Sequence, residues 1–169
     1  MVCLFHEKNK EHGFTLIELA IFLLITGTIL GVAAMAWSVL VEGRQIQAAK
    51  NTLKEANNCL MDFTLMAKKI PTGQYFANFC QKTDPWGLEL RYLSANQGQK
   101  LNCSSALTGT LSITVAPGDT RNSIAWVIIS AGPNKQFDYS ASGNYVDLSP
   151  GDDVHIMSSD MELHHEICP

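Results

Sequence analysis

The residue whose chemistry stands out in this sequence is a single carboxylate inside an apolar run. The run covers residues 14–41, FTLIELAIFLLITGTILGVAAMAWSVLV, and Glu18 is its only ionisable side chain. An ionisable group within hydrocarbon is costly unless it is paired, so Glu18 needs a positive partner. In a helix that begins near residue 14, Glu18 would lie in the first turn, where free backbone N–H groups and the helix dipole favour a negative charge.

A second group of oxygen-bearing side chains lies in loop-rich sequence near the C-terminal end. It consists of Asn134, Asp138, Asp147, Asp152 and Asp153. Calcium binds carboxylate, amide and carbonyl oxygens on a chain that can wrap around it. The adjacent Asp152 and Asp153, followed by the apolar Val154, could close such a loop, with Asn134 and Asp138 as further ligands. The spacing is not that of an EF-hand, and a solvated acidic turn in which Asp152 caps a local group is the alternative.

Four of the five cysteines follow the apolar run. They are Cys59, Cys80, Cys103 and Cys168, whereas Cys3 precedes the run. Their spacings of 21, 23 and 65 residues match no zinc pattern. Cysteines beyond a membrane segment indicate an oxidising compartment and two disulfides, although free buried thiols are the alternative. Three connectivities are possible, and the sequence does not choose among them.

Composition narrows the classes of function. A chain of 169 residues with 46% hydrophobic and 17% charged residues is long enough for one domain plus an appendage. The net charge of −4 and the lack of a basic run argue against a nucleic-acid partner. No nucleophile motif, phosphate-binding loop or HExxH sequence is present, so we expect no enzyme. His164, His165 and Glu166 are consecutive and would chelate a metal poorly, which favours a surface tail held by Cys168.

The elements that position these groups follow from periodicity. As a helix, residues 14–41 would reach about 42 Å, more than the ~30 Å hydrocarbon core of a bilayer. Residues 42–70 repeat apolar positions every three or four residues, which predicts an amphipathic helix that continues the first one. Pro71 and Gly73 would end it. The sequence therefore predicts one long helical rod.

The remainder, residues 71–169, reads as a sheet domain. Residues 86–92 and 111–115 alternate apolar and polar side chains, and residues 124–130 form a continuous apolar run that suits a central strand. A weaker strand is expected over 144–148. Short connections rich in Gly, Pro and Asn favour antiparallel pairing. The predicted fold class is α+β, a long N-terminal helix packed on a small antiparallel β-sheet.

Three interpretations of the apolar run remain. A signal peptide could be cleaved after Ala34-Met35-Ala36, and a plain signal anchor would leave Glu18 unexplained. The third interpretation rests on residues 13–19, GFTLIEL, which closely resemble the prepilin signal of the type IV pilin and type II secretion pseudopilin family. The leader before Gly13 is near neutral, whereas the family usually has a more basic one.

This resemblance implies how the chain is processed. A prepilin peptidase would remove residues 1–13 by cutting between Gly13 and Phe14, and would N-methylate the new amine of Phe14. Glu18 would then pair with the amine of an adjacent subunit during fibre assembly, or with the amine of its own chain. The implied partners are other pilin or pseudopilin subunits and an inner-membrane assembly platform. The implied location is the bacterial inner membrane, with a single span and a periplasmic ectodomain, and afterwards a pseudopilus or pilus.

The ectodomain resembles the same family more thinly. Residues 84–87, DPWG, are similar to a segment of the major, calcium-binding pseudopilins, as are residues 130–134 and the acidic pair within residues 151–154. The likeness to minor pilins is equally good. The resemblance implies calcium at the acidic loops and a structural subunit for secretion, DNA uptake or adhesion. The alternative function is an exported or anchored periplasmic binding domain that uses the apolar run only as a signal peptide or anchor.

Overall fold

Helix α1 runs from Leu16 to Ala67 in the computed structural model of the chain, which describes residues 15–102, 107, 109–149 and 151–168. The helix holds no proline, and its threonines satisfy their own hydroxyls: Thr26 Oγ1 donates to the carbonyl of Phe22 at 2.7 Å. It ends three residues before the predicted Ile70, because Lys68 takes a positive φ of 49° and Lys69 pairs with Lys100 in a short β-bridge.

The chain divides into two compact units, one up to Val41 and one from Glu42 onwards, which we call the N-terminal unit and the ectodomain. In the N-terminal unit, large apolar side chains of α1, from Leu16 to Val41, are exposed. This part of α1 is long and apolar enough to cross a membrane, by length and composition. The ectodomain holds the rest of α1 and the sheet.

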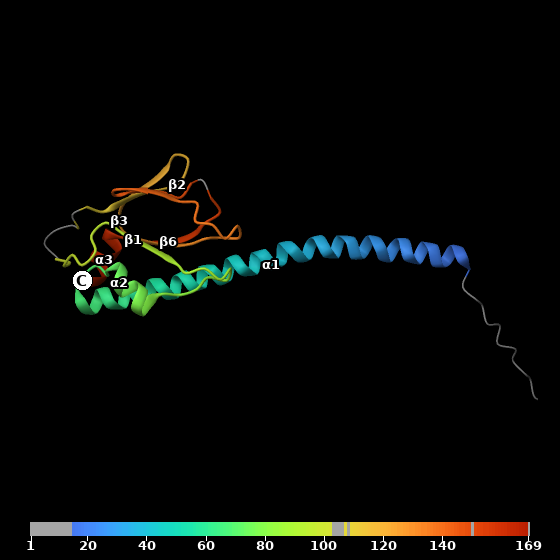
Figure 1. Cartoon of the computed structure of the whole chain (residues 1–169), viewed down its shortest axis with the longest axis horizontal. Coiled ribbons are helices and arrows are strands. Elements are labelled where there is room, and N and C mark those ends of the chain that lie inside the picture. Colours follow the sequence, from blue (N-terminus) through green and yellow to red (C-terminus); the bar gives the residue numbers. More distant parts are fainter. Residues whose placement is uncertain (1–14, 103–106, 108, 150, 169) are drawn as a thin grey trace, which may run out of the picture. The chain divides into compact units, whose positions relative to one another are not determined.

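The sheet of the ectodomain is curled and of mixed direction (Figure 1). Its strand order is β1-β3-β2-β5-β4, and β6 also pairs with β3. The strands are β1 Arg91–Ser94, β2 Leu111–Ala116, β3 Asp119–Ser130, β4 Ser140–Ser142, β5 Tyr145–Asp147 and β6 Val154–Ser159. The long β3 is therefore central, as predicted for residues 124–130. All pairs are antiparallel except β2–β5, a parallel pair that the sequence did not predict.

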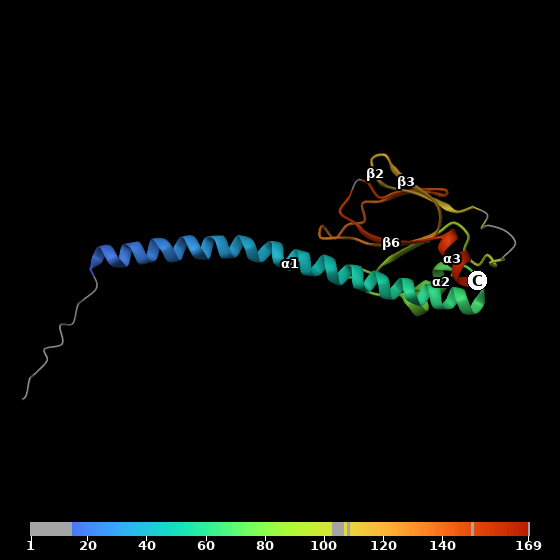
Figure 2. The ribbon, with the colours of Figure 1, turned by 180° about the vertical axis from the view of Figure 1, so that it is seen from behind.

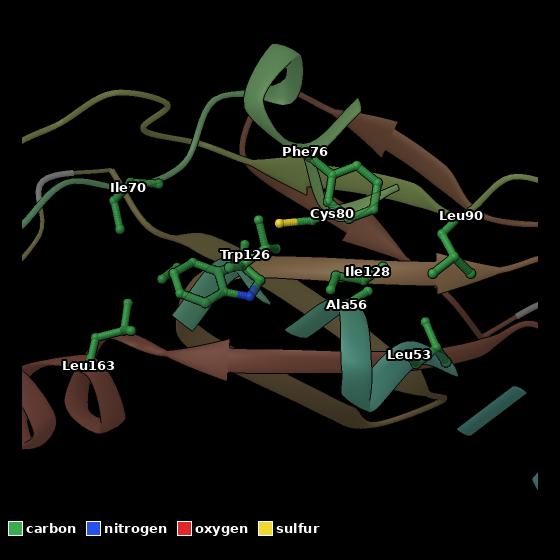
Figure 3. Close-up of a cluster of buried hydrophobic side chains, with 11 residues drawn as sticks. Leu53, Ala56, Ile70, Phe76, Cys80, Leu90, Trp126, Ile128 and Leu163 are labelled. Carbon is green, nitrogen blue, oxygen red and sulfur yellow. The ribbon is translucent and has the colours of Figure 1, made fainter. Parts of the chain in front are cut away.

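The C-terminal half of α1 covers one face of this sheet and confirms the α+β class. Leu53, Ala56 and Leu60 of α1 lie in a buried cluster with Trp126 and Ile128 of β3 (Figure 3). A polar contact also joins helix and sheet beside this cluster. Trp126 Nε1 donates to Asn57 Oδ1 at 2.9 Å, and Ser158 Oγ donates to the same oxygen at 3.1 Å.

Two predictions for the ectodomain were wrong in detail. The strand expected over 86–92 begins only at Arg91, because residues 84–88 form a turn. In that turn the Asp84 carboxylate accepts hydrogen bonds from the backbone N–H groups of Trp86 and Leu88, and Gly87 has a φ of 91°.

The expected surface tail is regular structure instead. Strand β6 pairs with β3 and leads into helix α3, Asp160–Ile167, which is seen from behind in Figure 2. Ser159 caps α3 by accepting from the N–H of Glu162, and Leu163 is buried in the core. Two short helical segments also follow α1, namely α2, Gly73–Tyr75, and the π-helix η1, Phe76–Cys80.

Candidate functional sites

The first candidate site is the start of α1, where Glu18 occupies the first turn. Glu18 N donates to Thr15 Oγ1 at 3.4 Å, and the Glu18 carboxylate accepts from Thr15 Oγ1 at 3.4 Å and from Thr15 N at 3.5 Å. This reciprocal arrangement is a capping box. It satisfies backbone N–H groups at the helix start but supplies no positive charge to Glu18.

Gly13 and Phe14, the predicted cleavage position, lie outside the described residues. The processing of the leader, residues 1–13, therefore stays a prediction. The described part of the site begins at Thr15, one residue after the expected new N-terminus.

The second candidate site is formed by two loops of the ectodomain, one before β4 and one before β6. One carboxylate oxygen from each of Asp138, Asp152 and Asp153 lies within 4.8 Å of the other two. Asp138 N donates to Asp153 Oδ2 at 3.0 Å, and Asn134 N donates to Asp152 Oδ2 at 3.2 Å. The structure thus brings together the four residues that the sequence proposed as calcium ligands.

Asn134 braces the loop rather than presenting its oxygen to the carboxylates. Its Oδ1 accepts from the N–H of Gln136 at 2.7 Å, and its Nδ2 donates to Asp138. Asp147 is not part of the group of three carboxylates. It accepts from the N–H of Ser149 at 2.9 Å, and the side chain and then the backbone of Ser149 lower the pKa of Asp147 by hydrogen bonding.

Two glycines allow the loops to approach each other. A Cβ on Gly132, whose φ is 68°, would lie 2.5 Å from the carbonyl oxygen of Asp152, and a Cβ on Gly151 would lie 2.4 Å from the Cβ of Asp138. Any larger residue at either position would have to displace the acidic loop. The sequence interpretation did not assign these glycines a role, although both flank the acidic residues in the printed sequence.

The environment of Asp153 in the acidic loops disfavours its negative charge. Burial, with the neighbouring Asp138 and Asp152 charges, raises the pKa of Asp153 to about 6. Asp153 Oδ1 is buried and accepts no hydrogen bond from the part of the chain that the structure describes. A carboxylate in such surroundings would be stabilised by a cation shared with its neighbours.

The cysteines are the third set of predicted residues. Cys59 of α1 is bonded to Cys80 of η1. Cys168 is also disulfide-bonded, and Cys103, the fourth of these cysteines, lies outside the described residues. The Cys59–Cys80 bond ties the segment after α1 back onto the helix.

The fold and the N-terminal site define a class of protein, an α+β ectodomain that follows an N-terminal helix apolar enough to cross a membrane. Within that class, residues 8–34 match the family model of the prokaryotic N-terminal methylation motif. The chain therefore carries a prepilin signal of the type IV pilin and pseudopilin kind, and this motif supports a pilin-like or pseudopilin subunit in general terms. No curated protein and no solved structure matches the chain.

The motif has two direct consequences. It implies a substrate of prepilin peptidase that assembles with other pilin subunits. Together with the apolar helix, it is consistent with an exported protein anchored in the inner membrane.

Proposed function

We propose that this chain is a structural subunit, not an enzyme, that assembles through its N-terminal helix into a type II secretion pseudopilus or a type IV pilus. The observation that carries the proposal is Glu18 in the first turn of an apolar helix that begins at a methylation motif. In its membrane state the subunit is a single-span protein of the inner membrane with a periplasmic ectodomain, and the assembly platform of that membrane extracts it.

The capping box gives the Glu18 carboxylate hydrogen bonds but no positive charge. Thr15 offers Glu18 hydrogen bonds from neutral donors, at 3.4 and 3.5 Å. In a medium of low dielectric constant, a carboxylate with neutral donors alone remains costly. Cleavage before Phe14 would create an α-amino group one helical turn from Glu18. A charged amine, on the same chain or on the next subunit, would complete the pairing and favour a bundle of helices over isolation in lipid.

Conservative substitutions of Glu18 test this proposal. Glu18→Gln keeps the size and hydrogen-bonding capacity but removes the charge, whereas Glu18→Asp keeps the charge. We expect Glu18→Gln to be cleaved normally and to enter fibres at least about tenfold less than the native chain. A tenfold loss corresponds to about 1.4 kcal/mol, and loss of the charge pair in hydrocarbon should cost at least that much. Glu18→Asp should retain more assembly than Glu18→Gln. The readout is the amount of processed subunit in sheared fibres relative to membranes. Normal fibre entry by Glu18→Gln would contradict the pairing argument.

We further propose that the acidic loops hold a calcium ion as a structural cofactor. Asp138, Asp152 and Asp153 would supply carboxylate oxygens, and Asn134 would hold the first loop in place. The buried Oδ1 of Asp153, which has no hydrogen-bond partner among the described residues, fits this role because a hard cation is the natural partner of a buried carboxylate oxygen. Bound calcium would neutralise charge and order the two loops.

Calorimetric titration of the processed protein with CaCl₂ tests the calcium proposal. We expect a dissociation constant of about 0.1 to 1 mM, the range of extracellular modules. Asp153→Asn should weaken binding by about tenfold or more. Asp147→Asn is the matched control, because Asp147 lies outside the carboxylate group and should leave binding unchanged. Equal affinity of the two variants would refute the assigned site.

A further inference from the structure

Two side chains near the ends of the apolar helical segment favour a boundary between hydrocarbon and water. Glu18 lies in the first turn of α1, and Trp37 lies near the other end of residues 16–41, which form one unbroken stretch of the helix (Figure 1). Trp37 follows Glu18 by 19 residues. That separation is about 29 Å along a helix, and the hydrocarbon core of a bilayer is about 30 Å thick. The two residues are therefore one hydrocarbon core apart.

The segment between these two residues suits hydrocarbon. Residues 19–36 carry no charge, and their only hydroxyl groups belong to Thr26 and Thr28. Thr26 Oγ1 donates to the carbonyl of Phe22 at 2.7 Å, and Thr28 Oγ1 donates to the carbonyl of Ile25 at 2.8 Å. Both hydroxyls are satisfied within the helix, as polar groups that face lipid must be.

Trp37 suits the boundary on the ectodomain side of the membrane. Its side chain is 68% exposed, and an indole with an apolar ring and a polar N–H is most stable at the level of the lipid headgroups. Val41, the last residue of the apolar run, lies about 6 Å further along the helix, and a headgroup layer is roughly 5 to 7 Å thick. The next residue, Glu42, is ionisable. The apolar run therefore ends where the headgroup layer would end.

We propose that Trp37 binds the phospholipid headgroup layer on the ectodomain side, and that Glu18 consequently lies at the opposite boundary of the hydrocarbon core. The inference rests on the proposed function in one respect, namely that the processed chain spans the membrane before it assembles. It adds the depth at which the helix rests, which the methylation motif does not specify.

This resting depth gives both residues a role when assembly starts. At the boundary, water and lipid headgroups reach the Glu18 carboxylate. Outward movement of the helix by two turns, about 11 Å, would carry Glu18 into hydrocarbon, where it needs a charged partner. The same movement would remove Trp37 from the headgroup layer. A subunit without a paired amine therefore stays at its resting depth, and pairing lowers the cost of extraction.

Fluorescence quenching by brominated phospholipids measures the depth of Trp37. The processed full chain is reconstituted into liposomes without assembly, and the emission of Trp37 is the difference between the native chain and Trp37→Phe. Trp86 and Trp126 are present in both proteins and drop out of this difference. We expect at least about twofold stronger quenching from bromine near the glycerol group than from bromine at the chain ends. Equal quenching, stronger quenching from the chain ends, or no quenching would overturn the proposal.

Cysteine labelling measures the depth of the other end of the segment. In inverted membrane vesicles the ectodomain is enclosed, so a membrane-impermeant maleimide reaches only the inner surface. We expect Thr15→Cys to be labelled at least about tenfold more than Thr28→Cys, because a thiol in mid-hydrocarbon does not form the reactive thiolate. The native chain gives the background from the other cysteines. Equal labelling of the two variants, or no labelling of Thr15→Cys, would overturn the position assigned to Glu18.

Both measurements use unassembled subunits, so they do not depend on fibre entry. If both depths are as expected but the native chain does not enter fibres, the proposed function fails and the Trp37 anchor stands. If the native chain enters fibres while Trp37 lies within the hydrocarbon core, only the anchor is wrong.

Discussion

Glu18 and Asp153 are both carboxylates in unfavourable surroundings, but for different reasons. Glu18 accepts hydrogen bonds from Thr15 and has no counter-charge among residues 15–102, 107, 109–149 and 151–168. Asp153 lies next to like charges, and one of its oxygens is buried with no donor from the described residues. Different partners would therefore stabilise them: a singly charged, protonated amine for Glu18 and a divalent cation for Asp153.

The raised pKa of Asp153 predicts a pH dependence of stability. Its pKa rises from 3.8 to about 6 on folding, because burial and the neighbouring carboxylates disfavour the charge. The folded state therefore binds the proton more tightly than the unfolded chain. The stabilisation that comes from protonated Asp153 is complete below pH 4 and is lost as the pH rises through 6.

The measurement compares the native chain with Asp153→Asn in the presence of a chelator. We expect the Tm of the variant, relative to the native chain, to rise between pH 4 and pH 7. His155 works in the opposite direction, since burial lowers its pKa, but it is present in both proteins and drops out of the difference. Added CaCl₂ should raise the Tm of the native chain at pH 7. A difference in Tm that does not change with pH would contradict the assignment.

At the scale of elements, the helix and the sheet are joined by one polar contact within an apolar interface. Asn57 accepts hydrogen bonds from Trp126 of β3 and Ser158 of β6, so one amide connects α1 to two strands. Because the apolar cluster around it is non-directional, we expect this contact to favour one register of α1 on the sheet.

Replacement of this amide measures that role. Asn57→Ala leaves the buried Trp126 N–H and the Ser158 hydroxyl without their acceptor. Loss of the two hydrogen bonds together should lower the free energy of unfolding by about 1 to 3 kcal/mol. The neighbouring Asn58 is exposed, and Asn58→Ala should change stability by less than about 0.5 kcal/mol. Urea unfolding of the full chain in detergent, followed by circular dichroism, gives both values. Equal stability of the two variants would show that packing alone sets the register.

Periodicity predicted the long helix, the central strand and the hairpin partner of that strand, because these segments bury regular faces. It failed where side chains redirect the backbone. The Asp84 carboxylate turns residues 84–88 away from the strand pattern, and Lys68 ends α1 early. Strand β6 and helix α3 were missed because their apolar residues are few and the histidines suggested a tail.

The candidate sites, like the fold, were predicted in part and missed in part. The acidic residues were proposed from their clustering in loop-rich sequence and from the family resemblance, and the structure gathers three of their carboxylates. The close approach of Gly132 and Gly151 to those residues joins loops far apart in the chain, so spacing could not show it. Thr15 was missed although T-x-x-E before an apolar run is a readable signal for a capping box.

At the scale of the whole molecule, the chain combines an apolar helical segment with an ectodomain that has its own core. The described large apolar side chains of the helical segment are exposed. The ectodomain is held together by the Cys59–Cys80 disulfide and by the packing of α1 on the sheet. An assembling subunit needs both properties. Under the proposed function, the disulfide stabilises the ectodomain in an oxidising compartment, and the apolar segment exchanges lipid for other copies.

The most direct test of this account is the intact mass of the processed protein purified from membranes. Cleavage before Phe14 and methylation of the new amine predict a mature chain that begins at N-methylated Phe14 and retains residues 14–41. A chain that begins at Trp37, or one that still carries residues 1–13, would contradict the assembly mechanism, because neither would place a charged amine beside Glu18 in an apolar helix.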